Sequence, residues 1–107
     1  MDVTNDTRNT KEQARILKVL SVEARAKIVY LLKENRLCVN ALSRRLGISQ
    51  GAVSQHLRIM RDAGLVIDEK EGYYVHYRLN PETLSRWKEM VNDLLSIDKL
   101  AERDVCD

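Results

Sequence analysis

The sequence predicts a mostly α-helical fold that carries a single β-hairpin. Residues 40–65 read as two short helices separated by a tight break at Gly47-Ile48-Ser49. After Gly64 the helical period ends: Leu65-Val66-Ile67 is rich in β-forming residues, and residues 73–79 alternate as in a β-strand. A helix pair followed directly by a hairpin is the layout of a winged helix-turn-helix, and we predict that fold for the chain.

Two helices are predicted before this unit. Thr10 and Gln13 have the spacing of a capping box, which places the start of the first helix at Lys11. Ser21 is then expected to cap a second helix. The buried side of the second helix is predicted to consist of Ile28, Leu31 and Leu32.

The two helices within residues 40–65 have clear start and stop signals. Gly47 can adopt the left-handed conformation that ends the first of them. Ser49 can cap the second, because its hydroxyl accepts a hydrogen bond from a backbone N–H one turn later. Gly64 has the position of a glycine that ends this helix, and Leu65 can fold back on Met60.

The second of these helices has an apolar side and a polar side. Val53, Leu57 and Met60 follow helical spacing and are predicted to face the core. The other side carries amides, a hydroxyl and guanidinium groups, which read base edges or hold phosphates in a DNA major groove. The alternative is a solvated helix face without a partner. With the neighbouring helix and the hairpin, the predicted DNA-contacting residues are Gln50, Ser54, Gln55, Arg58, Arg61, Arg44, Arg45, His76 and Arg78.

The predicted hairpin, which we call the wing, alternates along its second half and is acidic around its turn. Lys70-Glu71-Gly72 is the predicted turn. The acidic residues Asp68, Glu69 and Glu71 argue against strong contacts between the wing and phosphate. One face is predicted to hold Tyr73, Val75, Tyr77 and Leu79, and the other, exposed face Tyr74, His76 and Arg78.

The last predicted helix begins at Asn80-Pro81, with the asparagine as cap and the proline in the first turn. It carries an apolar stripe that needs a partner, and the first helix carries a similar one. We predict that these terminal helices form a homodimer interface. The alternative is that the stripe covers the core of its own monomer. The predicted interface residues are Leu84, Trp87, Val91, Leu94 and Leu17.

The totals limit the remaining classes of protein. A chain of 107 residues suits one domain, predicted over residues 1–107 with flexible tails at 1–9 and 99–107. No apolar run has the length of a signal peptide or membrane span, so a cytoplasmic protein is expected. Neither histidine has a nucleophile or carboxylate at motif spacing, and the chain has no Gly-rich phosphate loop. An enzyme is therefore not expected.

The two cysteines, Cys38 and Cys106, are too few for a disulfide scaffold or a complete structural zinc site. Cys38 precedes a predicted helix start, where backbone N–H groups and Arg36 favour a thiolate. One interpretation is a sensing thiol that binds a thiophilic metal or metalloid ion, or an oxidant, together with Cys106. The other is that Cys38 only occupies a helix-capping position and neither cysteine senses anything.

Three stretches, LKVLSVEARAKIVYLL, CVNALSRRLGISQGAVSQHLRIMRDAGLV and YYVHYRLNPE, closely resemble the ArsR/SmtB family of bacterial and archaeal repressors. The resemblance covers residues 17–95. It implies a homodimeric winged-helix repressor that binds an inverted-repeat DNA operator. It also implies release from DNA by a metal, a metalloid or a thiol-reactive signal.

The chain departs from the family pattern at three places, of which the first is the acidic wing, since wings of the family tend to be basic. Asn40 stands where the arsenic-, cadmium- and lead-type sensors carry a second cysteine. The final helix has none of the histidine ligands of the zinc-, cobalt- and nickel-type sensors, so a zinc site there is not expected. Two rival functions remain open: a winged-helix module that binds proteins, which the acidic wing favours, and a regulator without a bound small inducer.

Overall fold

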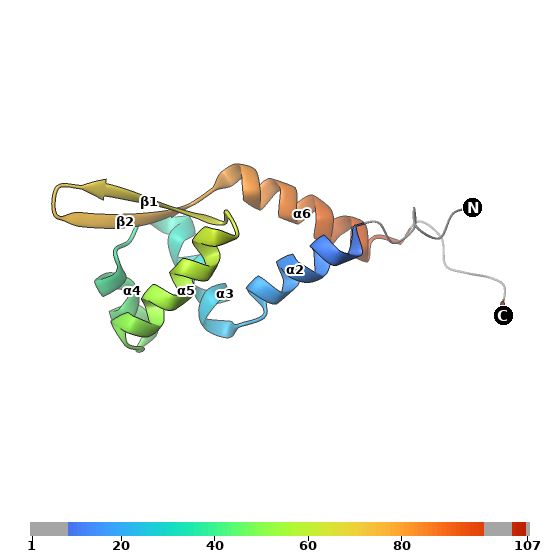
Figure 1. The fold of residues 1–107 in the computed structure, drawn as a ribbon, viewed down its shortest axis with the longest axis horizontal. Helices are drawn as coiled ribbons and strands as arrows, with labels where there is room; N and C mark the ends of the chain where they lie inside the picture. Colours follow the sequence, from blue (N-terminus) through green and yellow to red (C-terminus); the bar gives the residue numbers. More distant parts are fainter. Residues whose placement is uncertain (1–8, 98–103, 107) are drawn as a thin grey trace.

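The computed structural model describes residues 9–97 and 104–106, so the predicted tails fall largely outside the described residues. Within them, five α-helices and two antiparallel strands follow one another (Figure 1). This arrangement confirms the predicted winged helix-turn-helix. The elements are α2 (Thr10–Leu20), α3 (Glu23–Glu34), α4 (Val39–Leu46), α5 (Gln50–Asp62), β1 (Val66–Glu71), β2 (Tyr74–Leu79) and α6 (Pro81–Leu95).

The predicted cap of the first helix is wrong. Helix α2 begins at Thr10, and Asn9 occupies the N-cap position without a side-chain capping bond. Gln13 is buried, and its side-chain amide donates to the backbone oxygen of Met90 on α6 at 3.0 Å. A local capping pattern was therefore overridden by a contact between the two terminal helices, which lie side by side in Figure 1.

The prediction that Ser21 caps the start of the second helix is also wrong. It lies at the C-cap of α2, and its hydroxyl donates to the backbone oxygen of Lys18 at 2.8 Å. Helix α3 begins two residues later, after Val22 in extended conformation. A serine hydroxyl can also donate to a carbonyl in the last turn of a helix, and Ser21 does so here.

The boundaries of α4 and α5 agree with the sequence prediction. Gly47 has a φ of 69° at the end of α4, and the hydroxyl of Ser49 accepts from the N–H of Ala52 at 3.1 Å. At the end of α5, Gly64 has a φ of 81°. The N–H of Leu65 donates to the oxygen of Met60 at 2.9 Å, which closes a Schellman motif.

The wing turns later than the sequence predicted. Strand pairing continues to Glu71 opposite Tyr74, so Gly72 and Tyr73 form a two-residue turn, with a φ of 63° at the glycine. Tyr73 is therefore in the turn and not on a strand face. Leu37 also pairs with Tyr77 through backbone hydrogen bonds of 2.8 and 3.2 Å, which places β2 between β1 and the segment before α4.

The core lies where α3, α4, α5 and α6 converge, and it also holds residues of α2 and the base of the wing. Trp87 is part of this core with 3% of its surface exposed. Among the described residues, no helix is both long and apolar enough to cross a membrane. The buried core residues are Ile16, Val19, Ile28, Leu32, Leu37, Leu42, Val53, Leu57, Met60, Leu65, Val66 and Trp87.

Candidate nucleic-acid interface

The polar side of α5 is fully presented to solvent. Val53, Leu57 and Met60 of α5 are buried in the core, which fixes the rotation of the helix about its axis. Gln50, Ser54, Gln55 and Arg58 are consequently all exposed. A shallow hollow runs along this face, lined by Gly51, Ser54, Gln55, Arg58 and Ile59.

Two residues of this surface were missed in the sequence prediction. Ile59 is 39% exposed and lies one turn beyond Gln55, so helical spacing would have placed it on this face. An apolar side chain there suits the methyl group of thymine. Asn40 on α4 is the second, because its side-chain oxygen accepts from the amide of Gln50 at 3.2 Å. This bond directs the amide of Gln50 toward α4.

The guanidinium groups fall into two sets. Arg44, Arg45 and Arg58 are exposed and form no ion pair within the described part of the chain. Arg61 lies 3.5 Å from the carboxylate of Asp68 on the wing. Arg44, Arg45 and Arg58 can bind a phosphate directly. Arg61 can do so only after its ion pair with Asp68 breaks.

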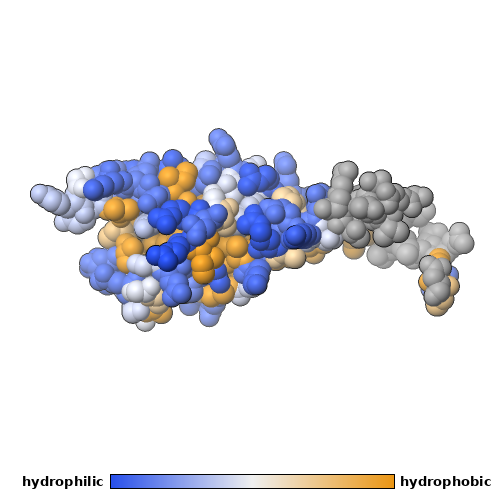
Figure 2. Space-filling view, viewed as in Figure 1, coloured by the Kyte–Doolittle hydropathy of each residue, from blue (hydrophilic) through white to orange (hydrophobic). Residues whose placement is uncertain are grey.

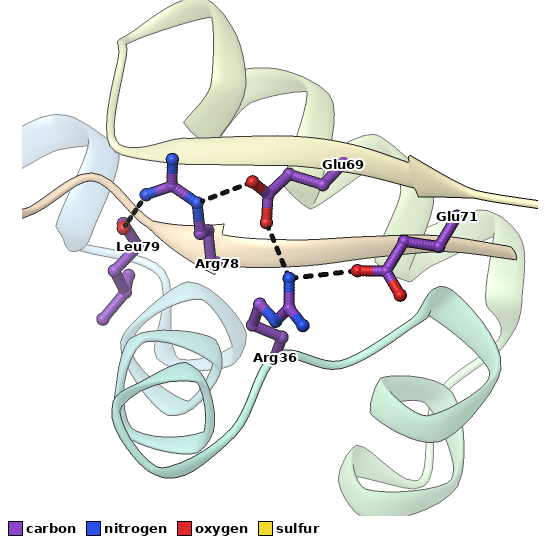
Figure 3. Close-up of polar contacts among 5 residues, drawn as sticks. All are labelled: Arg36, Glu69, Glu71, Arg78 and Leu79. Carbon is purple, nitrogen blue, oxygen red and sulfur yellow. Dashed lines mark hydrogen bonds and ion pairs between the residues drawn. The ribbon is translucent and has the colours of Figure 1, made fainter.

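Arg78 belongs to a network on the wing, shown in Figure 3. Arg36, just before α4, lies 3.1 Å from Glu69 and 3.1 Å from Glu71, and Arg78 lies 3.2 Å from Glu69. Hydrogen bonds from Arg36 and Arg78 lower the pKa of the Glu69 carboxyl below its ordinary value. The carboxylates that made the wing look repulsive to DNA are thus paired with arginines.

The register shows which way these wing side chains face. His76 pairs with Glu69, so both project from the same face of the hairpin as Arg78. Tyr77 lies on the opposite face and packs against the core. His76 was expected to be exposed but is half-buried. Contacts of His76 and Arg78 with phosphate remain predictions.

Cys38 occupies the N-cap of α4. Its Sγ accepts from the N–H of Ala41 at 3.5 Å, and the side chain is half-buried. Cys106 is exposed, in the short described segment 104–106. No group of three or more histidine, cysteine, aspartate or glutamate side chains within the described residues could hold a metal ion. A closed metal site therefore does not fit these side chains in a single chain, and the sensing role of the thiols remains a prediction.

The apolar stripe of α6 divides into a buried and an exposed part. Trp87 is buried within its own monomer, and Leu84 and Val91 are half-buried against the core. Leu94 and Leu17 are 42% and 41% exposed. Near the middle of the view in Figure 2, hydrophobic residues lie among hydrophilic ones, where Figure 1 draws α5 and α3 and not α6. An apolar groove of about 270 Å³ is lined by Leu20, Val29, Leu65, Leu84, Trp87, Lys88 and Val91.

Comparison with known proteins agrees with this geometry. The family model described as "Bacterial regulatory protein, arsR family" matches residues 23–68, from the start of α3 into β1. The arsenical resistance operon repressor of Escherichia coli (strain K12) is 41% identical over 80 residues, which cover 74% of this chain and 68% of that protein. The transcriptional activator HlyU of Vibrio cholerae (serotype O1, El Tor Inaba N16961) is 35% identical over 94 residues, covering 88% and 87%.

A solved structure gives the same result. The crystal structure titled "Possible transcriptional regulator for arsenical resistance" matches with a TM-score of 0.72 at 32% identity and covers 78% of this chain and 86% of that one. Sequence and fold thus match the same family over most of the chain, including the helix-turn-helix and the wing. This chain belongs to the ArsR family of bacterial regulatory proteins.

Proposed function

We propose that this chain is a homodimeric repressor that binds an inverted-repeat DNA operator through α5. The family consists of transcriptional regulators and not of enzymes, so the function lies in binding. The observation that carries the proposal is the exposed face of α5, with its two amides, hydroxyl and guanidinium on one side of a helix capped at both ends. A helix of this kind fits a DNA major groove.

The residues of this surface have different tasks. Gln50, Ser54, Gln55 and Arg58 read base edges, since amides pair with adenine and guanidinium with guanine. Arg44 and Arg45 on α4, and Arg61 after loss of its wing partner, hold phosphates. The phosphate contacts fix the position of α5, and the base contacts select the sequence.

Two copies of the chain are needed for tight binding, because one helix in one groove recognises few base pairs. Dimers of this kind place two recognition helices about 34–36 Å apart on the same side of the duplex. The adjacent terminal helices expose apolar residues: Leu17 on α2, and Leu94 and Leu95 on α6. Leu17 and Leu94 continue the stripes that the sequence predicted. We assign them to the interface between the two copies.

The proposed signal acts at Cys38. A bond formed by Sγ removes the acceptor that caps α4 and adds bulk beside the helix start. Helix α4 packs on α5, so a shift of α4 moves the DNA-reading face. Thiophilic ions such as As(III) or Cd(II), or an oxidant, suit a thiol, with Cys106 or an external thiol as the second group.

The proposal is tested by measuring how tightly the protein binds the promoter of the gene that encodes it. Fluorescence anisotropy should show tighter binding to a labelled duplex of that promoter than to a scrambled duplex of equal length. Transcription from the promoter in vitro should fall when the protein is added. Equal affinity for both duplexes would mean that binding is not sequence-specific. Binding to neither duplex would favour the rival function, a winged-helix module that binds proteins. Increased transcription would make the protein an activator, as HlyU is named.

A further inference from the structure

One side-chain hydrogen bond joins the two helices of the helix-turn-helix on their exposed side. Asn40, the second residue of α4, and Gln50, the first residue of α5, are both exposed. The Oδ1 atom of Asn40 accepts from the Nε2 atom of Gln50 at 3.2 Å. Figure 1 shows α4 beside the start of α5. The bond therefore lies at the edge of the surface assigned to DNA, and neither side chain belongs to the core.

The bond leaves Gln50 able to read a base. A glutamine amide has two N–H groups and an acceptor oxygen, so the bond to Asn40 uses one N–H and leaves the other N–H and Oε1. Adenine presents one acceptor and one donor in the major groove, N7 and the amino group at N6. The remaining two groups of Gln50 match this pair. An amide that is already held in place also loses less rotational freedom when it binds.

Asn40 has donors for a second contact. Its Nδ2 group makes no hydrogen bond within the described part of the chain. Asparagine side chains are among those that donate to DNA phosphates. The position is the one at which the arsenic-, cadmium- and lead-type sensors carry a second cysteine, but an amide is a poor ligand for a thiophilic ion. The chemistry of Asn40 therefore suits DNA better than an ion.

We infer that Asn40 is a positioning residue that sets the base preference of Gln50, an inference that rests on the proposed DNA-binding function. Oδ1 of Asn40 holds the Gln50 amide so that its remaining N–H and Oε1 pair with an adenine. Nδ2 of Asn40 donates to a phosphate beside that base pair. A chain of contacts thus runs from the phosphate through both amides to the base. Specificity at one base pair depends on a residue outside α5.

The first measurement finds the base pair that Gln50 reads. Fluorescence anisotropy compares the promoter duplex with duplexes in which one base pair at a time is changed in both half-sites. The base pair at which a change weakens the wild type but not Gln50→Ala is the one that Gln50 contacts. We expect an A·T pair there, with a preference of roughly tenfold over G·C. If no base pair behaves in this way, the inference about Asn40 is overturned.

Asn40→Ala tests whether Asn40 acts through Gln50. It should reduce the preference at that base pair about fivefold and keep the preferences at the others, because one hydrogen bond no longer holds the amide. In Asn40→Ala/Gln50→Ala, the preference at that base pair should equal that of Gln50→Ala alone. Gln55→Ala is the matched control, since it removes another exposed amide of α5. Its effect should add to that of Asn40→Ala.

Asn40→Asp separates the positioning of Gln50 from the phosphate contact. A carboxylate still accepts from Nε2 of Gln50, but it cannot donate to a phosphate and repels it. This variant should therefore keep the preference at the Gln50 base pair while it binds every duplex more weakly than the wild type. Loss of the preference, as in Asn40→Ala, would overturn the inference.

The remaining outcomes distinguish the inference from the function on which it rests. If the wild type binds no duplex, the proposed DNA-binding function fails. If the wild type discriminates between duplexes and Asn40→Ala has the same base preferences, the function stands and Asn40 does not position Gln50. A uniform loss on every duplex in Asn40→Ala also overturns the inference, because it indicates a phosphate contact alone. Circular dichroism should show wild-type helix content in all variants, since the replaced side chains are exposed.

Discussion

The N-cap of α4 is a cysteine, whereas the N-cap of α5 is a serine. Cys38 Sγ accepts from Ala41 N–H at 3.5 Å, whereas Ser49 Oγ accepts from Ala52 N–H at 3.1 Å. Sulfur is a weak acceptor, so a hydroxyl at this position would cap the helix at least as well. Capping alone therefore does not explain why this position holds a cysteine.

Single residues also decide where the helices end. We expect Gly64→Ala to lower the free energy of unfolding by about 1–2 kcal/mol, because its φ of 81° forces an L-residue into the left-handed region. An added Cβ would lie 3.6 Å from the hydroxyl of Thr83, an ordinary contact, so the cost comes from the backbone. Urea denaturation followed by circular dichroism measures it.

Gly51→Ala is the matched control. Gly51 lies in the first turn of α5, and a Cβ there would meet only the hydroxyl of Ser49 at 4.0 Å. Alanine favours helix by up to about 1 kcal/mol over glycine, so this variant should be as stable as the wild type or more so. Equal loss in both variants would mean that the left-handed turn at Gly64 does not determine the effect.

At the scale of elements, the sequence specified those whose ends depend on local chemistry. Gly47, Ser49 and Gly64 act through their own backbone and nearest neighbours, and the predicted boundaries of α4 and α5 hold. Gln13 and Ser21 carried equally good local signals, but each formed a different bond in the folded chain. The position of Met90 beside α2 could not be predicted from the sequence, because the two residues of this contact are far apart along the chain.

The wing shows a similar limit. Composition predicted the first strand and alternation the second, but neither signal shows at which residue the strand pairing stops. The glycine at Gly72 was the available signal, since a two-residue hairpin turn needs a positive φ. Charge pairing across segments was also invisible: nothing in the sequence links Arg36 to Glu69, which the pairing of Leu37 with Tyr77 brings together.

The two surfaces of the helix-turn-helix should respond differently to substitution. Gln55→Ala should cost about 1–3 kcal/mol on the promoter duplex and little on random DNA, because it removes a base contact. Arg44→Gln should weaken binding to both duplexes alike and reduce the salt slope by about one, because it removes a phosphate contact. Both side chains are exposed, so neither change should disturb the fold.

Affinity measured on both duplexes between about 50 and 200 mM salt distinguishes the two. Arg86→Gln on α6 is the control for net charge, since it also removes one positive charge from an exposed position away from α4 and α5. If Arg86→Gln reduced the slope as much as Arg44→Gln, the effect would reflect overall charge. If Gln55→Ala weakened both duplexes equally, Gln55 would not read bases.

At the scale of the whole molecule, an apolar stripe has two ways to be covered. The stripe on α6 predicted a dimer interface, and helical spacing alone cannot distinguish an interface from a core. The structure places Trp87 in the monomer core and leaves Leu94 and Leu17 exposed. A test of dimerisation should therefore avoid Trp87, whose replacement would damage the fold of the monomer itself.

We expect Leu17→Glu/Leu94→Glu to dissociate the dimer and to weaken operator binding together with it, because each half-site alone binds poorly. Analytical ultracentrifugation at micromolar concentration measures the mass, and circular dichroism checks the fold. Tyr30→Glu, which charges another exposed side chain, should remain dimeric. A wild-type protein that sediments as a monomer would contradict the proposed interface.

The release of DNA connects the residue, the element and the dimer. Modification of Cys38 would displace α4, tilt α5 in each copy, and separate the two reading faces from successive major grooves. By linkage, DNA must then weaken binding of the signal by the same factor. Cys38→Ser replaces the sulfur cap with an oxygen cap and should keep operator affinity while losing release by As(III), Cd(II) or diamide. Cys106→Ser should weaken release if that thiol supplies the second group, whereas zinc should act poorly on the wild type because α6 carries no histidine ligand. Titration of the operator complex with each reagent measures this, and a Cys38→Ser protein that responds like the wild type would make the thiol a helix cap and nothing more.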